Sequence, residues 1–105
     1  MTNSKRKGSA GEREWARFLT TNGYDARRGQ QYAGNPESPD VLCPDLAHMH
    51  FEVKRVQRLN LTDAMDQATR DAGDKTPILA HRKNHCRWMV TMYADDWIEL
   101  VREAV

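Results

Sequence analysis

The sequence contains little cysteine and no long hydrophobic segment. Its two cysteines, Cys43 and Cys86, are too few for a disulfide framework, so we expect a reduced, intracellular protein. No apolar run approaches the roughly 20 residues that a membrane span needs. Residues 1–8 are basic but have no apolar stretch behind them, as a secretory signal would. The sequence therefore argues against a disulfide-rich scaffold, a membrane protein and a secreted protein.

The chain also has almost no excess of either charge, since its formal net charge is +1. This balance argues at first against a nucleic-acid partner. The distribution is uneven, however: residues 1–60 carry ten Lys/Arg and seven Asp/Glu, net +3, whereas residues 61–105 carry six and eight, net −2. A metal ion bound by some acids of the first part would leave its surface more basic. The composition therefore permits phosphate binding.

The length of 105 residues predicts one domain. We expect a flexible basic arm over residues 1–8 and the folded domain over residues 9–105. Ser9 and Glu12 have the S-x-x-E spacing of a helix capping box, which predicts a helix that begins at Ser9. Asn22-Gly23 is a common stop signal and predicts its end.

The rest of the chain predicts alternating strands and helices. The predicted strands are residues 24–28, 41–43, 48–56, 77–81 and 86–92. A second helix begins at Asn60 and ends at Gly73, and a last helix begins near Asp95. The residues that this last helix is expected to bury are Trp97, Leu100, Val101 and Ala104. The order α-β-β-β-α-β-β-α predicts an α/β domain on one central mixed sheet of about five strands, with a parallel β-α-β crossover.

Two short runs carry the candidate chemistry, Pro39-Asp40 and Glu52-Val53-Lys54. Alternate side chains of a strand point to opposite faces, so Glu52 and Lys54 share one face. Asp40 and Glu52 would supply the oxygen ligands that Mg²⁺ prefers. Lys54 would neutralise a phosphate or orient an attacking water. The alternative is a solvated ion pair between Glu52 and Lys54, worth about 0 to 1 kcal/mol.

Glu12 shares the apolar side of the first predicted helix with Trp15, Phe18 and Leu19. A carboxylate on a buried face needs a partner, because an unpaired buried charge is costly. One reason for its position is the capping box with Ser9, and another is a metal ion at the edge of the sheet. The two reasons are compatible.

Histidine and cysteine form a rival constellation. Its members are Cys43, His48, His50, His81, His85 and Cys86. Such ligands suit zinc, but no CxxC pair precedes the H-x-x-x-H spacing as a zinc finger requires. His50 would point to the face of Glu52 and reach the margin of the proposed site. A zinc-stabilised interaction domain is therefore an alternative, and the cysteines are otherwise small core residues.

The order of Glu12 on a helix, Pro39-Asp40, Glu52-Val53-Lys54 and a further helix resembles the PD-(D/E)xK nuclease superfamily. The opening Lys7-Gly8-x-x-Gly11-Glu12 and the small size are similar to archaeal-type Holliday-junction resolvases and their compact phage relatives. The resemblance implies a restriction-endonuclease-like fold. It also implies a Mg²⁺- or Mn²⁺-dependent DNA endonuclease that acts on branched or four-way DNA as a homodimer, in the cytoplasm of a bacterial, archaeal or phage-infected cell.

By this resemblance, Glu12, Asp40 and Glu52 are metal ligands and Lys54 is the catalytic lysine. Basic residues flank these positions and would contact DNA phosphates without reading bases. They are Lys5, Arg6, Lys7, Arg27, Arg28, Arg55 and Arg58. Gln67 on the second predicted helix either lies near the active site, as a polar residue does in several relatives, or faces solvent. The alternative function is a non-catalytic nucleic-acid-binding module on the same fold.

Overall fold

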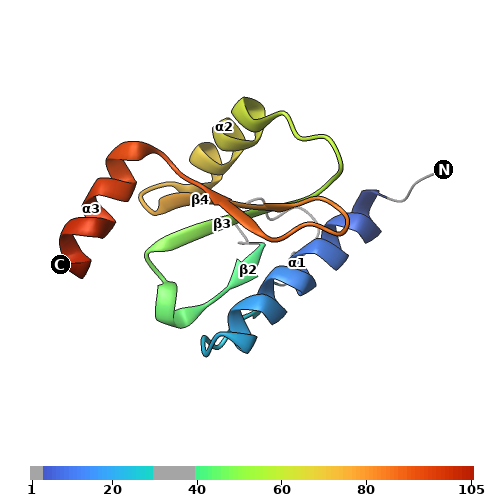
Figure 1. The fold of residues 1–105 in the computed structure, drawn as a ribbon, viewed down its shortest axis with the longest axis horizontal. Coiled ribbons are helices and arrows are strands. Elements are labelled where there is room, and N and C mark those ends of the chain that lie inside the picture. Colours follow the sequence, from blue (N-terminus) through green and yellow to red (C-terminus); the bar gives the residue numbers. More distant parts are fainter. Residues whose placement is uncertain (1–3, 30–39) are drawn as a thin grey trace.

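The computed structural model describes residues 4–29 and 40–105, with side chains from Gly8 onward (Figure 1). Its helices are α1 (Ser4–Thr21), α2 (Leu61–Ala72) and α3 (Ala94–Ala104), with a short 3-10 helix, η1 (Pro44–Leu46). Its strands are β1 (Arg27–Arg28), β2 (Val41–Leu42), β3 (Met49–Arg55), β4 (Thr76–Arg82) and β5 (Met89–Thr91). The order of helices and strands is the predicted one, with η1 added between β2 and β3.

The strands form two sheets in the described part of the chain, rather than the single five-stranded sheet predicted. One sheet has the order β3-β4-β5, with β3 and β4 parallel and β4 and β5 antiparallel. The other pairs β1 with β2 in antiparallel register. At the edge of β3, the N–H of Val53 donates to the side chain of Asp40. The side chain of Asp40 thus takes a hydrogen bond that a neighbouring strand would otherwise make.

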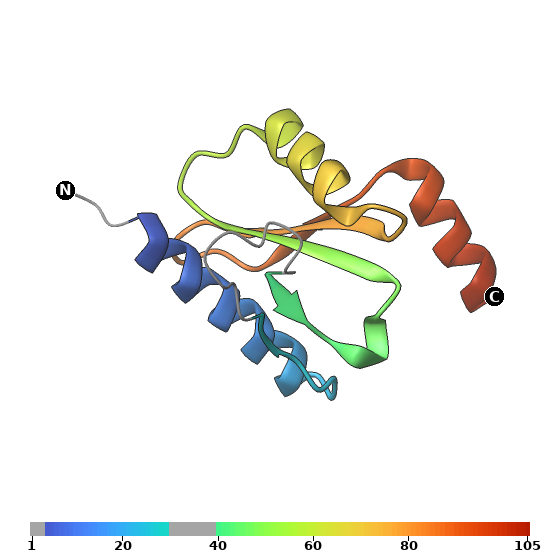
Figure 2. The same cartoon turned by 180° about the vertical axis from the view of Figure 1, so that it is seen from behind.

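Helices α1 and α2 cover opposite faces of the three-stranded sheet (Figures 1 and 2). On the α1 side, the buried cluster includes Trp15, Phe51 and Val53. On the α2 side, a smaller cluster joins Met65 to Leu79. Because the parallel register pairs Leu79 with Glu52, the side chain of Glu52 lies on the α2 side of β3.

Gly11 allows α1 to approach β3 closely. A Cβ atom at position 11 would lie 2.7 Å from the Cβ of Arg55, which is too close for two carbon atoms. The glycine of the K-G-x-x-G-E opening therefore has a packing role. It lets α1 bring the neighbouring Glu12 against the strand that carries Glu52.

The start of α1 differs from the prediction. The helix begins at Ser4, so part of the expected flexible arm, from Ser4 to Gly8, is helical backbone. Ser9 and Glu12 lie inside the helix, where they cannot form the predicted capping box.

The last helix also differs from the prediction, because its apolar residues are exposed. Trp97 is 52% exposed, and Leu100 and Val101 are exposed as well. Ala104 is likewise exposed. Helix α3 lies at one end of the molecule, away from α1 (Figure 1). Helix α3 is amphipathic as predicted, but its apolar side contacts little of the rest of the chain. No helix in the described residues has the length and apolar character to cross a bilayer.

Candidate active site

Strand β3 places three polar side chains on one face, as the alternation predicted. Lys54 Nζ lies 3.6 Å from Oε1 of Glu52, and Nε2 of His50 lies 3.9 Å from Oε2 of the same residue. Glu52 is only 4% exposed, whereas the side chain of Lys54 is about one-third exposed. The Glu52–Lys54 pair is thus partly buried, and the alternative of a fully solvated ion pair does not describe it.

Asp40 lies at the edge of β3, just before β2 begins. Its Oδ2 accepts a hydrogen bond of 3.3 Å from the N–H of Val53, which fixes the carboxylate next to the strand of Glu52. Burial raises the pKa of Asp40 to about 7, and the nearby carboxylates of Glu52 and Glu12 add to the shift. The hydrogen bond from Val53 opposes it. Asp40 therefore lies in a negative and partly dehydrated environment.

Glu12 reaches the same region from α1. It is 8% exposed, and its Oε2 accepts a hydrogen bond of 3.1 Å from Nε of Arg28 on β1. Burial raises the pKa of Glu12; the Arg28 guanidinium opposes this shift, and the charge of Glu52 adds to it. The buried carboxylate of Glu12 is thus paired with Arg28 and has no helix-capping role.

The structure therefore gathers three carboxylates from three segments of the chain: Glu12, Asp40 and Glu52. Grouped carboxylates repel one another, and each loses hydration on burial. A divalent cation would relieve both costs, because hard cations take carboxylate oxygens as ligands. Their oxygens are therefore candidate ligands for a divalent cation, and the ammonium of Lys54 lies beside Glu52.

Comparison with known proteins identifies the family of the chain. The family model of the archaeal Holliday junction resolvases (Hjc) matches residues 3–95. The chain belongs to this family. Membership indicates a nuclease of the junction-resolving kind, that is, a hydrolase of phosphodiester bonds, and it bears out the PD-(D/E)xK resemblance.

The solved structure of Hjc from Archaeoglobus fulgidus, a Holliday junction resolvase of an archaeal hyperthermophile, is similar to the chain. The TM-score is 0.59 and the sequence identity is 18%, over 80% of this chain and 75% of that chain. At this identity the likeness shows a shared fold. None of the curated proteins compared with the chain matches it.

The sequence did not indicate one acid of this region, Asp71 on α2. A ring nitrogen of His50 and carboxylate oxygens of Glu52 and Asp71 all lie within 4.8 Å of one another. Asp71 follows Gln67 by four residues, so the two share one side of the helix. The sequence therefore shows that Gln67 and Asp71 lie on the same side of α2. Whether that side faces β3 depends on how the helix packs, which the sequence does not show.

The basic residues expected to bind DNA differ in their surroundings. Arg27 is exposed on β1, whereas Arg28 is held by Glu12. Arg55 donates to Glu14 at 3.2 Å and to Asn84 at 2.7 Å, so it ties β3 to α1 and to the β4–β5 hairpin. The side chains of residues 5–7 lie outside the described ones.

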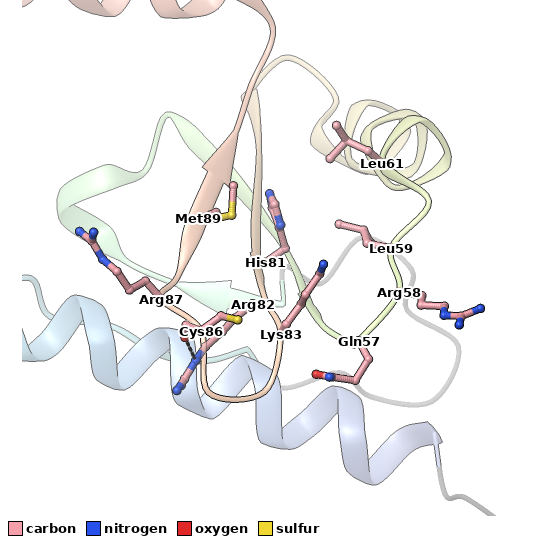
Figure 3. Close-up of a pocket in the computed structure, with 10 residues that line it drawn as sticks. All are labelled: Gln57, Arg58, Leu59, Leu61, His81, Arg82, Lys83, Cys86, Arg87 and Met89. Atoms are coloured by element: carbon pink, nitrogen blue, oxygen red, sulfur yellow. Dashed lines mark hydrogen bonds between the residues drawn. The ribbon is translucent and has the colours of Figure 1, made fainter.

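The seventh of these residues, Arg58, lines a pocket of about 600 Å³ beside the end of β3 (Figure 3). Further basic lining residues come from the β4–β5 hairpin. They are Arg82, Lys83 and Arg87. Figure 3 shows Arg58 and Arg87 extending outward on opposite sides, with Lys83 between them. None of the described lining residues is acidic. The sequence had suggested only a polar turn at Arg82-Lys83.

The candidate zinc ligands do not come together. Cys43 belongs to the buried core, whereas Cys86 is exposed and not a core residue. Nε2 of His81 lies 2.8 Å from Oγ1 of Thr91. Across residues 8–29 and 40–105, the histidine and cysteine candidates form no three-ligand group with one another; His50 instead joins acids.

Proposed function

We propose that the protein is a divalent-metal-dependent endodeoxyribonuclease that cleaves four-way DNA junctions. The observation that carries this proposal is the convergence of Glu12, Asp40 and Glu52 beside Lys54, in a chain of the resolvase family. The family supports a junction-resolving nuclease, and the carboxylates support its dependence on Mg²⁺ or Mn²⁺.

In this proposal Glu12, Asp40 and Glu52 hold the cation, and Lys54 acts at the phosphate. A bound divalent cation would polarise the phosphodiester and lower the pKa of a bound water. The ammonium of Lys54 lies within reach of Glu52 and is partly exposed, so it would meet the negative charge that develops on the phosphate oxygens. Arg28 opposes the rise in the pKa of Glu12 and orients its carboxylate for the role of a ligand.

The DNA backbone would run across the basic residues on either side of this site. Among the expected phosphate-binding residues whose side chains the structure describes, Arg27 and Arg58 are the exposed ones. Arg28 and Arg55 would have to exchange a carboxylate partner for a phosphate. We add Lys83 and Arg87 of the pocket to this surface, and we retain Lys5, Arg6 and Lys7 from the sequence. Such contacts position DNA without reading its sequence.

We further propose that the protein acts as a homodimer in the cytoplasm, with residues 9–105 forming one nuclease domain. Support comes from the exposed apolar residues of β5, of α3 and of the segment between them. They are Met89, Val90, Tyr93, Trp97, Ile98, Leu100 and Val101. Large apolar surfaces are rare on monomeric proteins, so we propose that these residues form a contact surface. A second copy related by a twofold axis would cover it and place two active sites on one junction.

Cleavage of a panel of synthetic DNAs tests the proposed function. Linear, flapped, forked and four-way DNA are incubated with the protein in Mg²⁺, in Mn²⁺ and in EDTA. We expect cutting of the four-way junction with either metal, none in EDTA, and none by Asp40→Asn. Junction binding without cleavage under any divalent ion would favour the non-catalytic module instead.

A further inference from the structure

A second group of potential metal ligands lies on the α2 side of β3, apart from Glu12 and Asp40. It consists of His50 and Glu52 on β3 and Asp71 on α2, with one ligand atom from each within 4.8 Å of the others. Atoms bound to one ion at about 2.1 Å lie roughly 3 to 4 Å apart. Nε2 of His50 and Oε2 of Glu52, at 3.9 Å, already have this spacing.

The state of His50 points to a ligand that the protein alone does not supply. His50 is 6% exposed, and its Nε2 has no hydrogen-bond partner among the described residues. A buried polar atom without a partner is unfavourable, because it loses its hydration and gains no hydrogen bond in return. The same nitrogen faces Glu52, so this ring atom and the carboxylate oxygens converge on one small volume. The imidazole is thus aimed into the acidic group.

The donor types select the kind of ion. Mg²⁺ prefers oxygen ligands only, whereas an imidazole nitrogen suits first-row transition metals. Asp71 is exposed, so the group opens to solvent on the α2 side and leaves room for water ligands. We propose that His50, Glu52 and Asp71 form a second cation site that takes a divalent transition metal, with Glu52 shared between this site and the carboxylates of Glu12 and Asp40.

Mn²⁺ binding to the untagged full chain, freed of metal with EDTA, tests this site without any DNA. Electron paramagnetic resonance counts bound Mn²⁺, and its electron spin-echo signal reports a directly bonded ¹⁴N. We expect a nitrogen coupling from imidazole in the wild-type protein and in Asp40→Asn, and none in His50→Gln. Two controls are expected to keep it: the exposed His48→Gln, and Asp66→Asn on another side of α2.

Asp71→Asn provides a second test, because an exposed residue is replaced and the fold should be retained. We expect the Mn²⁺ affinity of the nitrogen-coordinated site to fall roughly tenfold or more. Bound Mn²⁺ without nitrogen coupling, or coupling that survives in His50→Gln, would overturn the second site. The outcome is separable from the proposed function: nitrogen-coordinated Mn²⁺ in a protein that cuts no DNA would support this site and contradict the nuclease proposal.

Discussion

The backbone N–H of Val53 donates a hydrogen bond of 3.3 Å to Oδ2 of Asp40, and this bond links the two acidic runs of the sequence. Glu52 and Lys54 flank Val53 on β3, so a carboxylate bound to Val53 from the strand edge lies beside both.

The first prediction concerns the approach of α1 to β3. Gly11→Ala would place a Cβ 2.7 Å from the Cβ of Arg55 and force the helix outward. We expect a loss of about 1 to 3 kcal/mol in the free energy of unfolding, measured by urea denaturation. Gly8→Ala is the control, since its Cβ would meet only Oε1 of Glu12 at 3.9 Å. Equal stability of the two variants would contradict the close contact.

The second prediction concerns the partner of Glu12. Arg28→Ala leaves a buried carboxylate without its charged donor, so we expect the metal-free protein to lose about 1 to 2 kcal/mol of stability. The neighbouring Arg27→Ala removes an exposed arginine and should change little. Addition of Mg²⁺ should restore part of the loss, because a cation can replace the guanidinium. An Arg28 variant as stable as the Arg27 variant would argue against the ion pair.

The third prediction is a pH dependence. The pKa of Asp40 is raised from 3.8 to about 7 in the fold, so between these values the native state binds more protons than the unfolded state. Stability from this group is therefore present at low pH and is lost as the pH rises toward 7. In EDTA, Asp40→Asn should gain stability relative to wild type as the pH rises from 4 to 7. A difference independent of pH would refute the shift.

The fourth prediction concerns the apolar surface of β5 and α3. Trp97→Glu puts a charge at the centre of the proposed dimer contact, so we expect a monomer mass by light scattering where the wild type has a dimer mass. Arg102→Ala, on the same helix but outside the apolar residues, should remain dimeric. A wild-type monomer at every working concentration would remove the dimer from the account.

The strand pattern predicted more of the site than the helix pattern did. Alternation along β3 correctly put Glu52 and Lys54 on one face, with His50 beside them, because a strand has only two faces. The orientation of α2 was not predictable in this way, so Asp71 was missed. The partner of Glu12 was also missed, since Arg28 lies 16 residues along the chain and only the fold brings it near.

Helix α3 is amphipathic as its sequence predicted, but an amphipathic pattern does not show what the apolar side of a helix packs against. Burial of Trp97 within its own chain was therefore expected, and its exposure was not. The start of α1 was placed too late, because Ser9 and Glu12 imitate the spacing of a cap within a longer helix. The spacing of Ser9 and Glu12 cannot distinguish a helix that begins at Ser9 from a longer helix that contains both residues.

The fifth prediction tests the central claim, that Lys54 acts beside the gathered carboxylates. Single-turnover cleavage of a four-way junction in Mg²⁺ is compared for the wild type, Lys54→Ala and the exposed control Lys75→Ala, with junction binding measured in parallel. We expect Lys54→Ala to bind the junction as the wild type does but to cleave it about 10² to 10³ times more slowly, with Lys75→Ala unchanged. Cleavage by Lys54→Ala at the wild-type rate would contradict the account.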